Sequence, residues 1–176
     1  MLKYYMDKKI NIFLLVLLFS QFLMAKEPTM ALLIDIESND VQHFKIGNYP
    51  FTCKPYGVLG IDELHKQSSI NSTCKNAIKK FYSKRKDLMY YTMRKLHVMQ
   101  MYSVKFKNNR CIVNVSGEKS LAEYLLQEGL ALRKPFARDE EYDYYFEKYQ
   151  TEARVAKKGI WKENIIRECV ANIYKK

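Results

Sequence analysis

The stretch YSVKFKNNRCIVNVSGEKSLAEYLLQEGLA, residues 102–131, carries the local signals that decide the fold. Polar and apolar side chains alternate from Tyr102 to Lys107, and an apolar run resumes at Ile112. This alternation is typical of half-buried β-strands. Because asparagine tolerates positive φ, the pair Asn108-Asn109 between the two runs suits the tight turn of a β-hairpin. We therefore predict a hairpin around this pair.

A helix is expected directly after the hairpin. Ser120 and Glu123 have the spacing of a capping box, in which the Ser hydroxyl accepts from the Glu amide and the Glu carboxylate reaches back. Leu121, Tyr124 and Leu125 would then lie on one face, and Gly129 is a helix terminator. The order strand, turn, strand, helix is the centre of the predicted domain.

Further elements are expected on both sides of this stretch. Residues 31–36 and 41–46 suggest a first hairpin, and a third extended segment from 51 to 61 is interrupted by Pro55 and Gly57. Residues 74–82 have helical spacing. A last helix is predicted from about Asp139 to Lys158, with the buried stripe Tyr142, Tyr145, Tyr149, Ala153 and Ala156. These elements predict an α+β fold, a five-stranded OB-type β-barrel with about three helices.

The N-terminus has the pattern of a secretory leader. Lys8 and Lys9 precede the apolar run INIFLLVLLFSQFLMA, which ends at Ala25 before a polar segment. The run is short for a bilayer span, so we predict a signal peptide over residues 1–25, cleaved after Ala25, with an uncleaved anchor as the alternative. Met1 or Met6 is the start. The prediction is a single domain over residues 26–176, a monomer without a stable membrane span, secreted or periplasmic.

The charge balance is strongly basic. The 176 residues contain 30 Lys+Arg against 19 Asp+Glu, a net charge of +11. Loss of the leader removes three Lys and one Asp and lowers this charge by two. A hydrophobic content of 48% and only six Gly and four Pro exclude a disordered, collagen-like or low-complexity chain. The positive charge suits a phosphate-bearing partner.

Four cysteines are expected to form two disulfides, because exported thiols oxidise. Cys53, Cys74, Cys111 and Cys169 allow three connectivities, and sequence does not choose among them. The pair Cys53–Cys74 closes the shortest loop that leaves a sensible second pair. A zinc site formed by these cysteines is the weaker interpretation, since neither CxxC nor HxxxH spacing is present.

The segment from about 109 to 161 resembles the thermonuclease family, also called staphylococcal-nuclease-like. The residues that carry the resemblance are LLQEGLA at 125–131, a helix rich in Glu, Ala and Lys, and Gly159-Ile160-Trp161. A weaker likeness extends back to Ala31 through Leu59-Gly60-Ile61-Asp62. The resemblance implies cleavage of phosphodiester bonds by a calcium ion held by Asp residues, a Glu that activates water, and two Arg that neutralise the phosphate.

Only part of that apparatus is matched here. Asp62 matches one metal-binding Asp, and the other falls on Asn39 unless a shift of register brings Asp40 into its place. Arg110 matches the second Arg. Gly57 stands where the first Arg is expected, and His65 where the general-base Glu is expected. Glu63 or His65 could serve as the base instead, and Lys54 could replace the missing Arg.

Two functions from different classes follow from the resemblance. The first is an exported nuclease acting on DNA or RNA with Ca²⁺ or another divalent cation at Asp40 and Asp62, through Arg110, Glu63 and His65. The second is a catalytically silent domain that binds nucleic acid or another polyanion; a protein-interaction domain is a third, blander alternative. In either of the first two, the residues expected to bind nucleic acid are Arg110, Lys107, Lys54, Lys84 and Arg85.

Overall fold

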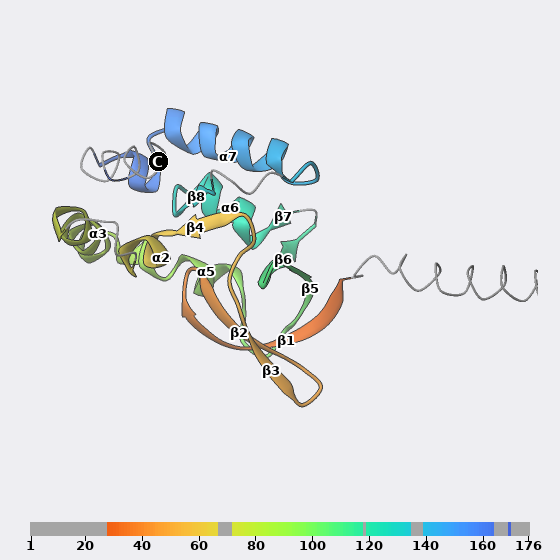
Figure 1. Ribbon diagram of the computed structural model, residues 1–176. Helices are drawn as coiled ribbons and strands as arrows, with labels where there is room; N and C mark the ends of the chain where they lie inside the picture. Colours follow the sequence, from red (N-terminus) through yellow and green to blue (C-terminus); the bar gives the residue numbers. More distant parts are fainter. Residues whose placement is uncertain (1–27, 67–71, 118, 135–138, 164–168, 170–176) are drawn as a thin grey trace, which may run out of the picture.

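A curved antiparallel sheet forms one side of the molecule (Figure 1). The computed structural model describes residues 28–66, 72–117, 119–134, 139–163 and 169. The sheet has the strand order β3-β2-β1-β5-β6-β7. Its strands are β1 (Thr29–Ser38), β2 (Val41–Ile46), β3 (Tyr49–Cys53), β5 (Met101–Lys107), β6 (Arg110–Ser116) and β7 (Lys119–Ser120). The predicted hairpins β1–β2 and β5–β6 are confirmed, and Asn108 and Asn109 have the positive φ values of 48° and 56° that the tight turn requires.

A second, two-stranded sheet pairs β4 (Val58–Gly60) with β8 (Ala131–Arg133). The third extended segment is therefore two strands in two different sheets. The chain leaves β3 at Cys53, passes through Pro55 and Gly57, and becomes helical at Ile61, directly after β4. Pro55 and Gly57 explain this break, because proline cannot donate a hydrogen bond to a neighbouring strand and glycine weakens a strand.

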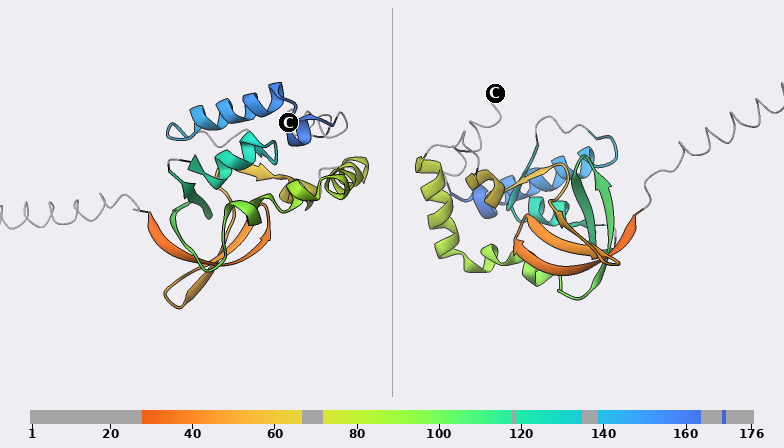
Figure 2. Two further views of the ribbon diagram at one scale, coloured as in Figure 1. Left: turned by 180° about the vertical axis from the view of Figure 1, so that it is seen from behind. Right: turned by 60° about the horizontal axis from the view of Figure 1, so that its bottom comes forward.

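Helices cover the side of the molecule opposite β1–β3 (Figures 1 and 2). The described helices are α2 (Ile61–Lys66), α3 (Ser72–Lys84), α4 (Lys86–Met89), α5 (Tyr91–Lys95), α6 (Leu121–Gln127), α7 (Asp143–Val155) and the 3-10 turn η1 (Gly159–Trp161). The capping box of α6 is confirmed: Ser120 and Glu123 cap each other in both directions. Gly129 ends this helix region with φ of 67°.

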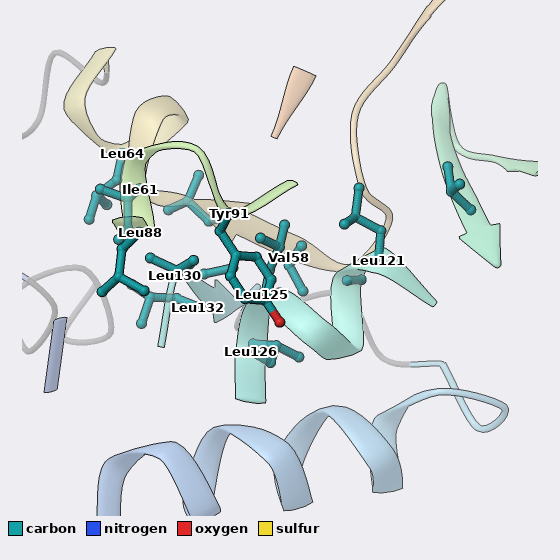
Figure 3. Close-up of a cluster of buried hydrophobic side chains, with 14 of the residues drawn as sticks. Val58, Ile61, Leu64, Leu88, Tyr91, Leu121, Leu125, Leu126, Leu130 and Leu132 are labelled. Carbon is teal, nitrogen blue, oxygen red and sulfur yellow. The ribbon is translucent and has the colours of Figure 1, made fainter. Parts of the chain in front are cut away.

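The core lies between the sheets and α6. Leu125 and Leu126 of α6 are fully buried and lie against Val58, Tyr91 and Leu132 (Figure 3). Their burial holds β4, and with it the start of α2, in place. Removing a buried Leu side chain of this kind costs about 2–5 kcal/mol of stability.

Three predictions about the elements need correction. The α+β class with an OB-like arrangement holds, but the described strands number eight in two sheets and do not close into a five-stranded barrel. The described residues contain six α-helices rather than about three. The last helix begins at Asp143, and its buried face consists of Phe146, Tyr149 and Ala153, while Tyr145 is 47% exposed. Packing against α6 selects this face.

The cysteines form two disulfides, Cys53–Cys111 and Cys74–Cys169. The favoured pairing Cys53–Cys74 is therefore wrong. Cys53 ends β3 and Cys111 is the second residue of β6, and an isolated bridge between Pro55 and Cys111 brings these two strand ends together. Spatial proximity of the strands, not the length of the closed loop, decides the pairing.

The expected signal peptide, residues 1–25, lies outside the described residues. Among the residues that the structure describes, no helix has the length and apolar character needed to cross a membrane.

Candidate active site

Arg110 and Glu63 form a partly buried ion pair near the centre of the molecule. Nη2 of Arg110 donates to Oε1 of Glu63 at 2.6 Å. Nη1 donates to the carbonyls of Pro55 and Val58, each at 3.3 Å. The side chains are only 17% and 22% exposed. The guanidinium is therefore held on one side by α2 and on the other by the segment between β3 and β4.

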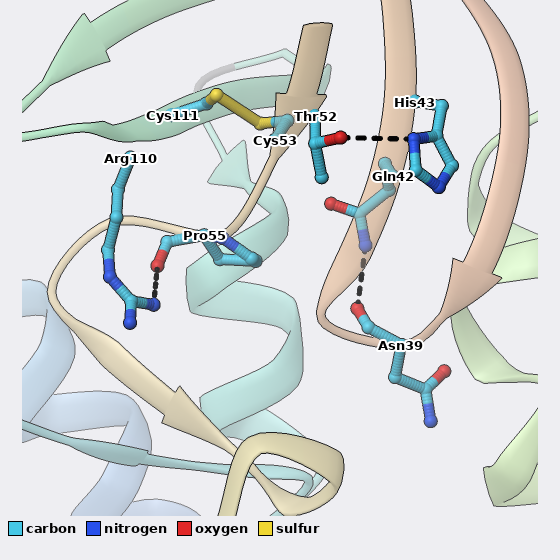
Figure 4. Close-up of a disulfide and its surroundings, with 8 residues drawn as sticks. All are labelled: Asn39, Gln42, His43, Thr52, Cys53, Pro55, Arg110 and Cys111. Carbon is cyan, nitrogen blue, oxygen red and sulfur yellow. Dashed lines mark hydrogen bonds between the residues drawn. A yellow bond between two sulfur atoms is a disulfide. The ribbon is translucent and has the colours of Figure 1, made fainter.

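The disulfide Cys53–Cys111 fixes the segment that receives the guanidinium (Figure 4). The amide of Cys111 donates to the carbonyl of Lys54 at 2.9 Å, and the amide of Tyr56 donates to the carbonyl of Cys111 at 2.8 Å. Because Arg110 directly precedes Cys111, this covalent link positions the arginine against the chain that carries Lys54 and Pro55.

Lys134 brings a second cation to Glu63. Its Nζ lies 3.8 Å from Oε1 of Glu63. Its backbone amide donates to the carbonyl of Gly57 at 2.9 Å, so Lys134 lies directly beside the position that the resemblance assigns to the first Arg. No sequence pattern indicates this role, since the contact depends on the pairing of β8 with β4.

Gly57 cannot be replaced by an arginine without rearrangement. Its φ is 71°, a conformation that L side chains rarely adopt, and a Cβ placed there would lie 2.5 Å from the Phe146 ring. The space next to Gly57 is therefore filled by α7, and the cation comes from the neighbouring strand instead.

The charges around Glu63 keep it ionised. Burial would raise the pKa of Glu63, but the hydrogen bond and charge of Arg110, with the charges of Lys134 and Lys54, outweigh this effect and lower the pKa. The other carboxylate oxygen, Oε2, is buried and has no hydrogen-bond partner among the described residues. Because Oε2 has almost no accessible surface, Glu63 serves in this structure to hold the neighbouring cations, and a water would reach this oxygen only after neighbouring groups move.

Arg110, Glu63 and Lys134, together with Lys54, are called the Arg110 cluster below. Two further carboxylates, Asp40 and Asp62, lie beside this cluster. Oδ2 of Asp40 accepts from the amide of Glu63 at 2.8 Å, and Oδ1 accepts from the Ser38 hydroxyl at 2.9 Å. A side chain on Gly60 would overlap the Asp40 carboxylate, so the close approach depends on glycine there. Burial, and then the charge of Asp40, raise the pKa of Asp62 to about 6.

Asn39 has a structural role. Its Nδ2 donates to the carbonyl of Leu88 at 2.8 Å, and its Oδ1 accepts from the amide of Thr92 at 2.9 Å. These bonds tie the β1–β2 turn to α4 and α5. The Asn39 side chain is thus directed to α4 and α5, although its backbone bonds Asp62, and the carboxylate beside Asp62 is that of Asp40.

The surroundings of His65 differ from those of Glu63. It follows Glu63 by two positions on α2, and residues at that spacing point to different sides of a helix. Burial, followed by the charges of Lys79, Lys75 and Lys66, lowers the pKa of His65. The structure joins Glu63, and not His65, to the arginine.

The other side chains predicted to bind nucleic acid differ in whether they are already paired with a carboxylate. The ammonium of Lys107 pairs with Asp139 and lies 4.0 Å from Glu141. Arg85 makes two hydrogen bonds to Asp87, at 2.9 and 2.8 Å. Lys84, at the end of α3, is exposed. Lys54 is exposed, and its charge acts on Glu63, so it belongs to the cluster.

The fit of a divalent cation can be judged from the donors present. In the described part of the chain, no group of three or more His, Cys, Asp or Glu side chains is arranged to hold a metal ion. Asp40 and Asp62 are two close carboxylates; the backbone of Asn39, the Tyr82 hydroxyl and the charge of Lys66 partly offset the effects that raise the pKa of Asp62. Asp40 is buried, and both of its oxygens already accept hydrogen bonds. Magnesium-type sites often use one or two carboxylates, with water and phosphate completing the shell. The described residues therefore supply two carboxylates but not a complete metal site.

Comparison with known families gives one result that bears on this site. A family model described as staphylococcal nuclease homologue matches residues 57–163, more than half of the chain. The matched range contains Asp62, Glu63, Arg110 and Lys134, whereas Asp40 precedes it. A comparison with curated proteins finds no match.

Proposed function

Because the chain belongs to the staphylococcal nuclease homologue family, we propose that it is an exported nuclease with an altered active site, acting on DNA or RNA. The observation that carries the proposal is the cluster in which Glu63 lies between Arg110 and Lys134. This cluster restores two cations and one carboxylate near the positions where the resemblance requires them.

The cations of the cluster would bind the scissile phosphate. Three donors of Arg110 are occupied by protein oxygens, and a guanidinium has five. The remaining two can donate to a phosphate oxygen, and Lys134 adds a point charge. Preorganised donors of this kind stabilise the charge that develops as a phosphoryl group is transferred, and losing one typically costs about 10²–10³ in rate.

Glu63 would hold Arg110 and Lys134 in place, and it would orient the attacking water once substrate binding makes its buried oxygen Oε2 accessible. Its lowered pKa makes it a weak base, but positioning contributes much of the catalysis in phosphoryl transfer. Asp40 and Asp62 would hold Ca²⁺ or another divalent cation. Such an ion, when bound, supplies positive charge to the phosphate oxygens.

Export is part of the proposal. All four cysteines are paired in disulfides, and disulfides persist in oxidising compartments. Together with the leader-like pattern at residues 1–25, this supports a secreted or periplasmic location.

A catalytically silent binder of nucleic acid is the second candidate. The observation that favours it is the filling of the space at Gly57 by Phe146, which denies the site an arginine at that position. In this case the cluster and the net charge of +11 would bind phosphates without cleaving them.

A cleavage and binding assay separates the two candidates. Purified protein with both disulfides formed is incubated with plasmid DNA and with RNA, in Ca²⁺, in Mg²⁺ or in a chelator. The nuclease proposal predicts metal-dependent cleavage that falls about 10²-fold or more in Arg110→Ala and in Glu63→Gln. Arg94→Ala, which removes an exposed arginine of α5, is the charge-matched control and should cleave normally.

The other outcomes are equally decisive. Binding that weakens with salt and depends on Arg110, but without cleavage, would favour the silent binder. Neither cleavage nor binding would reject both candidates. Cleavage that Arg110→Ala leaves unchanged would place the activity elsewhere on the chain.

A further inference from the structure

A tyrosine-lined cavity lies between the end of β6, β7 and α7, apart from the Arg110 cluster. Its volume is about 580 Å³. Among its lining residues are Asn114, Ser116, Lys119, Tyr124, Tyr145 and Tyr149. Figure 1 shows α7 running along α6, and the lining residues come from β6, β7, α6 and α7. The volume is in the range of sites that hold small molecules, about 300–1,000 Å³.

Lysines surround the rings of this tyrosine cavity. Nζ of Lys119 lies 4.6 Å from the centre of the Tyr149 ring and 5.7 Å from that of Tyr124. Lys95 lies 4.8 Å from the Tyr124 ring, and Lys148 lies 5.9 Å from the Tyr149 ring. Aromatic rings interleaved with cations are the arrangement that binds single-stranded nucleic acid, because bases stack on the rings and phosphates meet the cations.

The acidic residues of the cavity are engaged by other groups. Glu123 is buried, and one of its oxygens accepts from the amide and hydroxyl of Ser120. Glu141 accepts from Lys105 and from the Tyr142 hydroxyl. Lys105 balances the charge of Glu141. The three lysines near the rings, Lys95, Lys119 and Lys148, outnumber Glu123, so these charges together favour an anion.

Strand β6 contributes Asn114 to the cavity and Arg110 to the Arg110 cluster. Arg110 and Asn114 point to the same face of β6, since side chains alternate along a strand and the register with β5 is regular between them. Four residues at about 3.3 Å each separate their backbones by about 13 Å. This is a spacing that a few nucleotides of a single strand can cross.

We propose that the tyrosine cavity binds a nucleotide unit, with the base stacked on Tyr145 and the phosphate neutralised by Lys119. The inference deepens the proposed function and rests on it. The nucleotide is either a unit of a bound strand or a free mononucleotide such as a cleavage product; both have the same chemistry. Tyr145 is the stacking candidate because it lines the cavity yet is 47% exposed.

Exposed tyrosines offer a matched set of variants. Tyr145→Ala removes the ring from the cavity, and Tyr145→Phe keeps it. Tyr49→Ala is the control, because Tyr49 is 82% exposed, belongs to β3 and does not line the cavity. Tyr144 is unsuitable as a control, since its ring packs against that of Tyr145 at 5.3 Å. Lys119→Gln removes the central cation. Because Tyr145 and Tyr49 are exposed, we expect their variants to fold like the wild type.

The experiment measures binding of adenosine 5′-monophosphate, inorganic phosphate and a short oligothymidylate by calorimetry, using the full protein. We expect Tyr145→Ala to weaken binding of the mononucleotide about 5- to 100-fold, while Tyr145→Phe and Tyr49→Ala bind like the wild type. Lys119→Gln should weaken it as well. A parallel loss for the oligothymidylate would identify a strand as the source, and no loss for it would identify the free nucleotide.

Two results would overturn the inference. The first is mononucleotide binding that Tyr145→Ala leaves unchanged, and the second is inorganic phosphate binding as tightly as the mononucleotide, which would mean that the base contributes nothing. Failure here is distinct from failure of the proposed function. If Arg110→Ala weakens binding of the oligothymidylate while Tyr145→Ala weakens neither the oligothymidylate nor the mononucleotide, the Arg110 cluster stands and the cavity proposal falls.

Discussion

Replacing Asp62 with Asn should stabilise the protein, and the gain should depend on pH. Asp62 is largely buried beside Asp40, and its pKa is raised from 3.8 to about 6. A group whose pKa is higher in the folded state contributes its stability fully below the unfolded value and loses it as the pH rises through the folded value. Above pH 6, the ionised Asp62 carboxylate therefore destabilises the fold.

The magnitude follows from the shift. One pKa unit corresponds to about 1.4 kcal/mol, so a shift of about two units corresponds to about 3 kcal/mol. Asp62→Asn removes the charge and keeps the shape and an acceptor oxygen. We expect the free energy of unfolding to rise by up to about 3 kcal/mol at pH 8 and to change little below pH 3.8.

Urea unfolding across this pH range measures the effect. Asp35→Asn is the matched control, because Asp35 is an exposed aspartate of the neighbouring strand β1. Calcium should stabilise the wild type at pH 8 more than it stabilises Asp62→Asn, since a ligand stabilises the state that binds it. A variant less stable than the wild type at pH 8, or a stability difference that is the same at every pH, would refute the reasoning.

Three further predictions concern the framework of the site. Gly57→Arg should lower stability by about 2 kcal/mol or more, measured by thermal unfolding, because of the positive φ and the Phe146 ring; a stable variant with increased cleavage would contradict this. Asn39→Asp should also destabilise, by about 2 kcal/mol, since it places a carboxylate against a carbonyl that now accepts from the Asn39 amide; unchanged urea unfolding would count against it. Loss of either disulfide should cost about 2–5 kcal/mol. Only loss of Cys53–Cys111 should also weaken binding of DNA in a titration, because this disulfide fixes the segment that receives Arg110; equal weakening by loss of Cys74–Cys169 would argue against that role.

Features encoded within a few residues could be predicted from the sequence. The turn at Asn108-Asn109 and the capping box of Ser120 and Glu123 have the predicted positions. In both cases the responsible hydrogen bonds or φ values lie within the motif itself, so no tertiary information is needed.

Features set by tertiary packing could not be predicted. The pairing of Cys53 with Cys111 depends on strands meeting across a separation of 58 residues. The place of Lys134 beside Glu63 depends on the register of β8 with β4. The buried face of α7 passes through Phe146 rather than Tyr145 because α6 packs there. Helical periodicity alone permits either face.

Within the candidate site, the sequence identified the residue types but not their partners. Glu63 was one of two possible bases, and the structure joins it to Arg110. Asp40 was the alternative to Asn39, and the hydrogen bond from the Glu63 amide brings it to the site. These choices depend on the geometry of the β1–β2 turn and of α2, which no local pattern specifies.

The salt dependence of DNA binding tests most directly whether the Arg110 cluster binds the nucleic-acid backbone. Binding of a single-stranded oligonucleotide is titrated against salt concentration for the wild type, Arg110→Ala, Lys134→Ala and the control Lys80→Ala, which changes an exposed lysine of α3. Each lost phosphate contact lowers the steepness of log K against log salt by about 0.7 for single strands. We predict weaker binding and a shallower slope in Arg110→Ala and Lys134→Ala only. Slopes and affinities equal to those of the wild type in both variants would contradict the account.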